Sequence, residues 1–296
     1  MDIYDCFMYF DEDLLLDLRM NALNKYVKKF IITEATYTHN GAKKKLNFNI
    51  KNFQKFKDKI EYIVVDKSPP NILELIDGES ENKRGTKLIL NGMARDYFQR
   101  ENLNSGLSNA QNEDLVLISD LDEIPDLSSL DFSKINNNII IFEQKMFYYK
   151  LNLLQENFIW HGSRISKKKH LIDPQWIRNI KSKKYPLWKL NILFSKTKYN
   201  NINFIKDGGW HFTNIKSAEE IDNKFKNYLH DLEYEESGLK VDDVRKIISE
   251  KKIIYDHSAD KRNNKWNSQI NLIKEADTHL PDYIVNNKAK FKSWID

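Results

Sequence analysis

The chain has 296 residues, 41% of them hydrophobic and 12% aromatic, so it can bury the core of one large α/β domain or of two small ones and does not have the composition of a disordered chain. Its 47 basic and 43 acidic residues leave a net charge of +4, and because the two signs are interspersed we expect no nucleic-acid-binding face. One cysteine excludes an intramolecular disulfide, and the absence of a signal peptide and of any apolar run of about 18 residues predicts a cytoplasmic protein.

Lysines gather in three short runs, at 43–45, 167–169 and 183–184. We interpret these runs as solvated surface. The alternative is that one of them meets an anionic substrate, or an anionic membrane with which the protein associates peripherally.

The first third of the chain contains both strand and helix patterns. Apolar, β-rich segments predict strands at 3–10, 27–33 and 60–65, and helical spacing of apolar residues predicts helices at 14–25 and 87–103. A loop from 66 to 84 is expected to hold a short helix at 72–76. Residues 43–59 are polar with spaced aromatics, and they give no clear prediction.

Three polar residues of these elements are candidates for binding: Glu34 after the second strand, and Arg95 and Arg100 on the second helix. Glu34 ends the second strand and begins a segment rich in hydroxyls up to Gly41, which is typical of a binding loop, although a surface acid or a helix cap fits equally. Arg95 and Arg100 lie on the helix at 87–103. Arginine suits bidentate contact with phosphate, and the alternative is an exposed helix face.

The stretch from Asp114 to Pro125, DLVLISDLDEIP, is the most informative. Its apolar residues 115–118 predict a short buried strand, and Pro125 ends any strand that follows. On extended chain Asp120 and Asp122 point the same way. They would then stand at the carboxyl edge of a sheet, where open α/β folds bind ligands.

Two neighbouring carboxylates raise one another's pKa unless a cation lies between them. Hard oxygen ligands suit Mg²⁺ or Mn²⁺, and Mg²⁺ is usually held by one or two carboxylates together with substrate phosphates. The pattern Asp120-Leu-Asp122 therefore predicts a clamp for a metal and a diphosphate. The alternative is a solvated turn capped by Asp120.

The second half predicts strands at 138–142, 145–151 and 157–166, so close together that we expect the sheet to become mixed or antiparallel. Asp173-Pro174 predicts the start of a short helix. A capping box at Ser217 and Glu220 opens a helix to about residue 232, and another helix is expected at 241–251. We expect a catalytic domain over 1–215 and a helical extension over 216–296 packed on it.

Residues 203–212, NFIKDGGWHF, form the second informative stretch. Paired glycines allow a backbone to approach a ligand closely. Trp210 is a candidate to lie against a sugar ring, and His211 is a candidate to complete a metal shell or to contact a phosphate. The alternative is a core tryptophan and a structural histidine beside a tight turn.

Taken together, these segments resemble glycosyltransferase family 17, the group that includes β-1,4-mannosyl-glycoprotein β-1,4-N-acetylglucosaminyltransferase. The matching segments are spread from the N-terminus to about residue 215: Ile3 to Phe7, Ile31 to Ala35 with Thr38 and Gly41, Gln99-Arg100, Asp114 to Pro125, and Gly208 to Phe212.

The resemblance implies a GT-A-like fold with a central mixed sheet flanked by helices, a divalent metal (Mn²⁺ or Mg²⁺), and inverting transfer of a sugar, most simply N-acetylglucosamine. The donor would be a UDP-sugar, and the acceptor would be a glycan, a lipid-linked saccharide or another hydroxyl compound. Metal ligands would be Asp120, Asp122 and His211. The donor site would be formed by Glu34, Arg95, Gln99, Arg100, Asp120 and Trp210.

A base must deprotonate the acceptor hydroxyl, and the sequence offers Asp207, Glu143 and Glu123 as candidates. Asp207 ranks first because it adjoins Gly-Gly-Trp-His, and Glu123 would otherwise support the Asp-x-Asp motif. Two other functions stay open at this point. One is a haloacid-type phosphatase, whose own Asp-x-Asp continues to a threonine near the N-terminus, and the other is a non-catalytic module that binds carbohydrate or nucleic acid.

Overall fold

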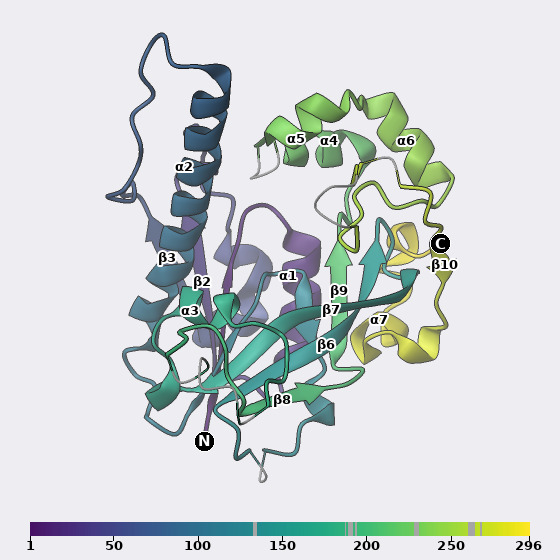
Figure 1. The fold of residues 1–296 in the computed structure, drawn as a ribbon. Helices are drawn as coiled ribbons and strands as arrows, with labels where there is room; N and C mark the ends of the chain where they lie inside the picture. The colour runs from purple at the N-terminus through teal and green to yellow at the C-terminus, as the bar shows by residue number, and fades with distance from the viewer. Residues whose placement is uncertain are drawn as a thin grey trace.

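The computed structural model describes residues 1–132, 135–186, 188, 192, 194–227, 231–259, 264–266 and 268–296. The apolar runs of the first third of the chain, together with the run at 115–118, form parallel strands of one sheet (Figure 1). These are β1 (Ile3–Met8), β2 (Lys29–Ala35), β3 (Ile60–Val65) and β4 (Leu115–Ile118), in the order β3-β2-β1-β4. All three pairings are parallel.

Successive residues of β1 point to opposite faces of the sheet, and both faces are covered. Ile3 and Phe7 pack with α1 (Asp13–Leu23) and with the 3₁₀ segment η1 (Ile50–Lys59). Tyr4 and Cys6 pack instead with η2 (Asn102–Leu107) and α3 (Pro174–Asn179). Helix α2 (Glu81–Glu101) leads into η2 on this second face.

The sheet is mixed in its second half, as expected from the closely spaced strands. Strand β7 (Leu153–Lys167) pairs antiparallel with both β4 and β6 (Ile139–Tyr148). Strand β6 pairs in parallel with β8 (Ile202–Ile205) and with β9 (Gly209–Thr213), and β9 pairs antiparallel with β5 (Glu123–Pro125). The short β10 (Ile273–Lys274) joins β7.

The C-terminal helices pack on this sheet through two groups of contacts. Helices α4 (Ala218–Asn227) and α6 (Val241–Ser249), with α5 (Asp231–Ser237), form a core with residues of β6 such as Met146 and Tyr148. Helix α7 (Asp282–Asn286) packs against α1. The predicted capping box is present, since Ser217 and Glu220 each accept the other's backbone N–H. In the described ranges, no helix is long and apolar enough to cross a bilayer.

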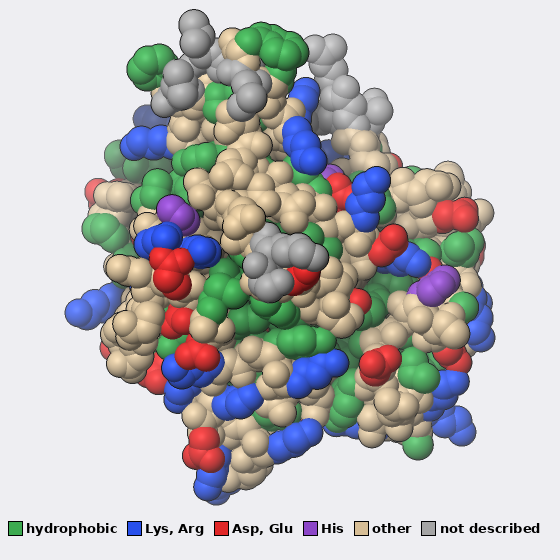
Figure 2. Space-filling model, turned by 90° about the horizontal axis from the view of Figure 1, so that it is seen from below, with side chains coloured by type: hydrophobic (Ala, Val, Ile, Leu, Met, Phe, Trp, Pro, Cys, Tyr) green, Lys and Arg blue, Asp and Glu red, His purple; other side chains and the backbone are tan. Residues whose placement is uncertain are grey.

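Two predictions about elements were wrong. Residues 72–76 are not helical, because the side chain of Asn91 bonds both the N–H and the carbonyl of Leu73 and so satisfies that backbone without a helical turn. The strands expected at 138–142 and 145–151 are the single strand β6, whose pairing with β7 shifts register twice. Basic and acidic side chains lie beside one another over much of the face seen in Figure 2, in keeping with the interspersed charge.

Candidate active site

The acidic motif lies at the carboxyl ends of the parallel strands, beside a cleft of about 470 Å³. Met8 at the end of β1 lines this cleft together with Asp120 and Asp122, which follow β4. This is the edge at which open α/β sheets bind ligands. Residues 121 and 122 form a turn before β5 and are not on extended chain, so the alternation argument does not explain why both acids reach the cleft.

Arg19 holds that turn from beneath. Its guanidinium donates to Ser119 Oγ at 2.5 Å and to the carbonyl oxygens of Asp120 (3.1 Å), Leu121 (3.3 Å) and Glu123 (2.7 Å). It also pairs with Asp5 at 2.6 Å, and both side chains are fully buried. The backbone of the acidic turn is therefore fixed by one arginine inside the core.

We expect Arg19→Met to lower the free energy of unfolding by roughly 3–5 kcal/mol, because Asp5 would be left buried without its partner. Urea denaturation followed by circular dichroism measures this. Lys28→Met is the matched control, since Lys28 pairs with Asp2 at 2.5 Å in an exposed position and should shift the midpoint little. Equal stability of the two variants would contradict a structural role for the Arg19 pair.

Asp120 is held between two arginines. Its Oδ1 lies 3.1 Å from Arg100 Nη2, and its Oδ2 lies 2.9 Å from Arg178 Nη2. Burial alone would raise the pKa of Asp120, but Arg178 and Arg100 outweigh it and hold that pKa well below its usual range. Because the side chain keeps 37% of its exposure, it presents a fixed, ionised acceptor to the cleft.

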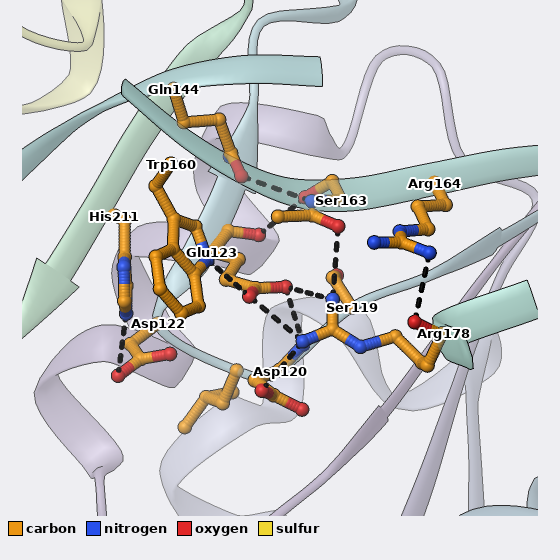
Figure 3. A network of polar contacts seen from close by, with 12 residues as sticks. Ser119, Asp120, Asp122, Glu123, Gln144, Trp160, Ser163, Arg164, Arg178 and His211 are labelled. Atoms are coloured by element: carbon orange, nitrogen blue, oxygen red, sulfur yellow. Dashed lines mark hydrogen bonds and ion pairs between the residues drawn. The ribbon is translucent and has the colours of Figure 1, made fainter. Parts of the chain in front are cut away.

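Glu123 lies behind Asp120 and is completely buried. Its carboxylate accepts two hydrogen bonds from Arg178, at 2.6 and 2.9 Å, one from Trp160 Nε1 at 2.6 Å, and one from the Asp120 N–H at 3.0 Å (Figure 3). Glu123 does not line the cleft. It fits the expected supporting role for the motif, and this geometry does not favour it as the base.

Asp122 and His211 form the second pair in the cleft, with Oδ2 and Nε2 3.5 Å apart (Figure 3). Burial opposes both charges, but each partner outweighs it, so the pKa of His211 is raised and that of Asp122 is lowered. The buried Nδ1 of His211 has no hydrogen-bond partner among the described residues. The His211 ring lies against Trp160, with centroids 4.8 Å apart.

The side chains of Asp120, Asp122 and His211 decide whether the cleft can hold a divalent metal. Asp122 and His211 offer one oxygen and one nitrogen donor side by side, while Asp120 is engaged by arginines. In the part of the chain that the structure describes, no three His, Cys, Asp or Glu side chains are gathered as a metal site. The donor set therefore fits a metal that takes its remaining ligands from water and substrate, as Mg²⁺ commonly does.

Besides Asp120, three of the residues predicted for the donor site lie at or near the cleft. Arg100 and Gln99 line it, and the Gln99 amide donates to the carbonyl of Thr33 at 3.0 Å. Arg95 does not line it, but its Nη1 donates to the carbonyl of His39 at 2.8 Å, and His39 is a cleft residue. Arg95 thus supports the loop that forms one wall.

Glu34 is fully buried and lies outside the residues that line the cleft. It accepts hydrogen bonds from the backbone N–H groups of Asn47 (2.7 Å) and Phe48 (3.0 Å), and from the hydroxyl of Tyr62 (2.8 Å). Lys44 pairs with it at 2.5 Å. The structure therefore places Glu34 as an anchor for the segment after β2 and not on the lining of the cleft.

The second informative stretch is divided between two faces of the sheet. On β9, His211 faces the cleft, whereas Trp210 lines a different hollow, because neighbouring residues of a strand point to opposite faces. Asp207, in the turn before β9, lines the same hollow as Trp210. Glu143 is also absent from the cleft lining, and its carboxylate lies 3.6 Å from His161. Neither Asp207 nor Glu143 therefore lies on the lining of the cleft that holds Asp120 and Asp122.

At Gly209, the second residue of the glycine pair, the packing of the backbone itself requires glycine. A Cβ on Gly209, where φ is +128°, would lie 2.3 Å from the carbonyl oxygen of Ile124 and 2.7 Å from the nitrogen of Asp126. Glycine is required there so that β9 can approach β5. This close pairing sets His211 opposite Glu123 in the register of the two strands.

Several cleft residues were missed by the sequence reasoning. Arg178 ends the short helix whose start at Asp173-Pro174 was predicted, but nothing in the pattern marks it as functional. Glu12, at the start of α1, and Trp160, on β7, also line the cleft. The sequence does contain one signal for the buried Arg19–Asp5 pair that holds the acidic turn. Asp5 is an acid within an apolar strand, and such an acid needs a buried partner.

The family model "Glycosyltransferase family 17" matches residues 1–295. Among solved structures, HddC from Yersinia pseudotuberculosis and the same protein complexed with GMP-PN are each 10% identical, with a TM-score of 0.33, and cover 69% of this chain and 89% of theirs. No curated protein matches the chain.

Proposed function

Since the chain belongs to glycosyltransferase family 17, we propose that it transfers a sugar from a UDP-sugar, with N-acetylglucosamine as the first candidate, to a hydroxyl of a saccharide acceptor, with inversion at the anomeric carbon. Membership of a glycosyltransferase family does not favour the two alternative functions, a haloacid-type phosphatase and a non-catalytic binding module. The observation that carries the proposal is the meeting of Asp120, Asp122 and His211 in one cleft at the carboxyl edge of the sheet.

Asp122 and His211 would hold Mn²⁺ or Mg²⁺ in this proposal, and the bound metal would neutralise charge on the departing diphosphate. Asp120 stays ionised between its two arginines and accepts hydrogen bonds from donor hydroxyls. Arg100 and Arg178 keep Asp120 oriented, since their own N–H groups are engaged with Asp96, Gln175, Glu123 and the carbonyl of Gly162. Lys224, on the same cleft, adds positive charge near the leaving group.

Glu12 takes the place of Asp207 as the candidate base. It lines the cleft, and burial, together with the neighbouring Asp11, raises its pKa above the ordinary value for a glutamate. A carboxylate of raised pKa is a better proton acceptor. In the proposed step Glu12 removes the proton from the acceptor hydroxyl, the hydroxyl oxygen bonds to the anomeric carbon, and the bond to UDP breaks on the opposite face.

A panel of nucleotide sugars tests the proposal. We expect UDP release from UDP-N-acetylglucosamine with Mn²⁺ or Mg²⁺, increased by saccharide acceptors and abolished by EDTA. Release that survives EDTA would contradict the metal, and turnover of a GDP-sugar in place of every UDP-sugar would contradict the donor class. Phosphate release from simple esters without turnover of any nucleotide sugar would contradict the transfer itself.

A further inference from the structure

A second hollow, of about 720 Å³, lies on the opposite face of β9 from the cleft. Its walls come from the end of α1, from residues 125–128 after β5, and from residues 278–283 at the start of α7. Helices α1 and α7, which are distant in sequence, pack against each other (Figure 1).

Aromatic rings supply much of its wall. Tyr26, Trp210 and Tyr283 all line it, and each is partly buried against the main core. The indole N–H of Trp210 donates to the carbonyl of His279 at 2.7 Å, so the ring is held in place before any ligand arrives. Rigid aromatic surface with a polar partner is a good platform for a ligand that is apolar on one face and polar at its edges.

The charged groups on the hollow have both signs. The carboxylates of Asp126, Asp207 and Asp282 line it together with the ammonium groups of Lys25 and Lys145, and that of Lys145 lies 3.2 Å from Glu275. A phosphate or another anion would face the carboxylates, so this lining does not suit it. A neutral ligand rich in hydroxyl groups can donate to the carboxylates and accept from the ammonium group.

We propose that this hollow is a saccharide-binding site, separate from the transfer cleft, that holds a neutral oligosaccharide segment of the acceptor or product. The volume lies within the range of ordinary ligand sites. The inference rests on the chain being a glycosyltransferase, and it does not depend on the donor or the metal. Because Trp210 and His211 point to opposite faces, the bound segment is remote from the sugar unit that reacts.

The test is calorimetric titration of the whole protein, without donor or metal, with three neutral probes: chitotetraose, maltotetraose and mannotetraose. We expect at least one probe to bind, and Trp210→Ala to weaken its binding about tenfold or more, as for removal of a central aromatic anchor. Asp122→Asn, on the other face of the sheet, should leave this binding unchanged.

Asp207→Asn combined with Asp282→Asn provides a second variant at exposed positions, in case Trp210→Ala fails to fold, and it should weaken binding severalfold. Failure of all three probes to bind wild-type protein would overturn the proposal. So would equal weakening by Asp122→Asn, which would place the saccharide in the cleft. UDP release from the nucleotide-sugar panel is independent of these results, so failure of the proposed function would be seen separately.

Discussion

Asp122→Asn should reduce kcat/KM for nucleotide-sugar turnover by about 10²–10³-fold, the loss typical when one group that stabilises developing charge is removed. The amide keeps the size of the side chain but loses its charge, so it would bind the divalent metal far more weakly than the carboxylate does. UDP release under saturating Mn²⁺ measures the change, and circular dichroism checks that the fold is intact.

Asp66→Asn is the matched control for this substitution. Asp66 directly follows β3, another parallel strand, and its side chain is exposed and does not line the cleft. It should retain wild-type turnover. Near-normal activity of Asp122→Asn would mean that the acid after β4 has no part in binding the metal or the donor.

Glu12→Gln should lower kcat by about 10²–10⁴-fold, the range for loss of a general base, while the KM for the donor changes little. Glu12 is the cleft carboxylate that burial and Asp11 make more basic. Glutamine fills the same space but cannot take up the proton. Steady-state kinetics with a saccharide acceptor measures both constants.

The pH dependence gives an independent check on Glu12. Because a base must be deprotonated and the pKa of Glu12 is raised, wild-type kcat should fall as pH drops through that raised pKa. The residual activity of Glu12→Gln should lack this acidic limb, whereas Glu61→Gln, an exposed glutamate on β3, should keep it. A limb that persists in Glu12→Gln would assign the base to another residue.

Local patterns predicted the elements well wherever the side chains alone decide the outcome. The apolar run at 115–118 forms β4, residues 60–65 form β3, and the capping box at Ser217 precedes α4. The order of the strands was not predictable in this way. It depends on long-range pairing, such as that between β4 and β7, which no local pattern encodes.

The site was predictable to the extent that its residues lie on one short segment. Asp120 and Asp122 share the cleft, with His211 brought from β9 and Arg100 from α2. Asp207 lies in the turn before β9, with φ at +48°, and lines the other hollow, so its nearness to His211 in the sequence did not bring it into the cleft. Arg178 was missed because its importance arises only from its contacts with Asp120 and Glu123.

The central claim is that the turn after β4 binds a sugar nucleotide through a metal, and titration of UDP into the protein by calorimetry tests it most directly. We expect UDP to bind wild-type protein when Mn²⁺ is present and to bind far more weakly in EDTA. For Asp122→Asn, the affinity for UDP should be the same with Mn²⁺ and in EDTA. Equal affinity of wild-type protein with and without the metal, or unchanged metal-dependent binding in Asp122→Asn, would contradict the account.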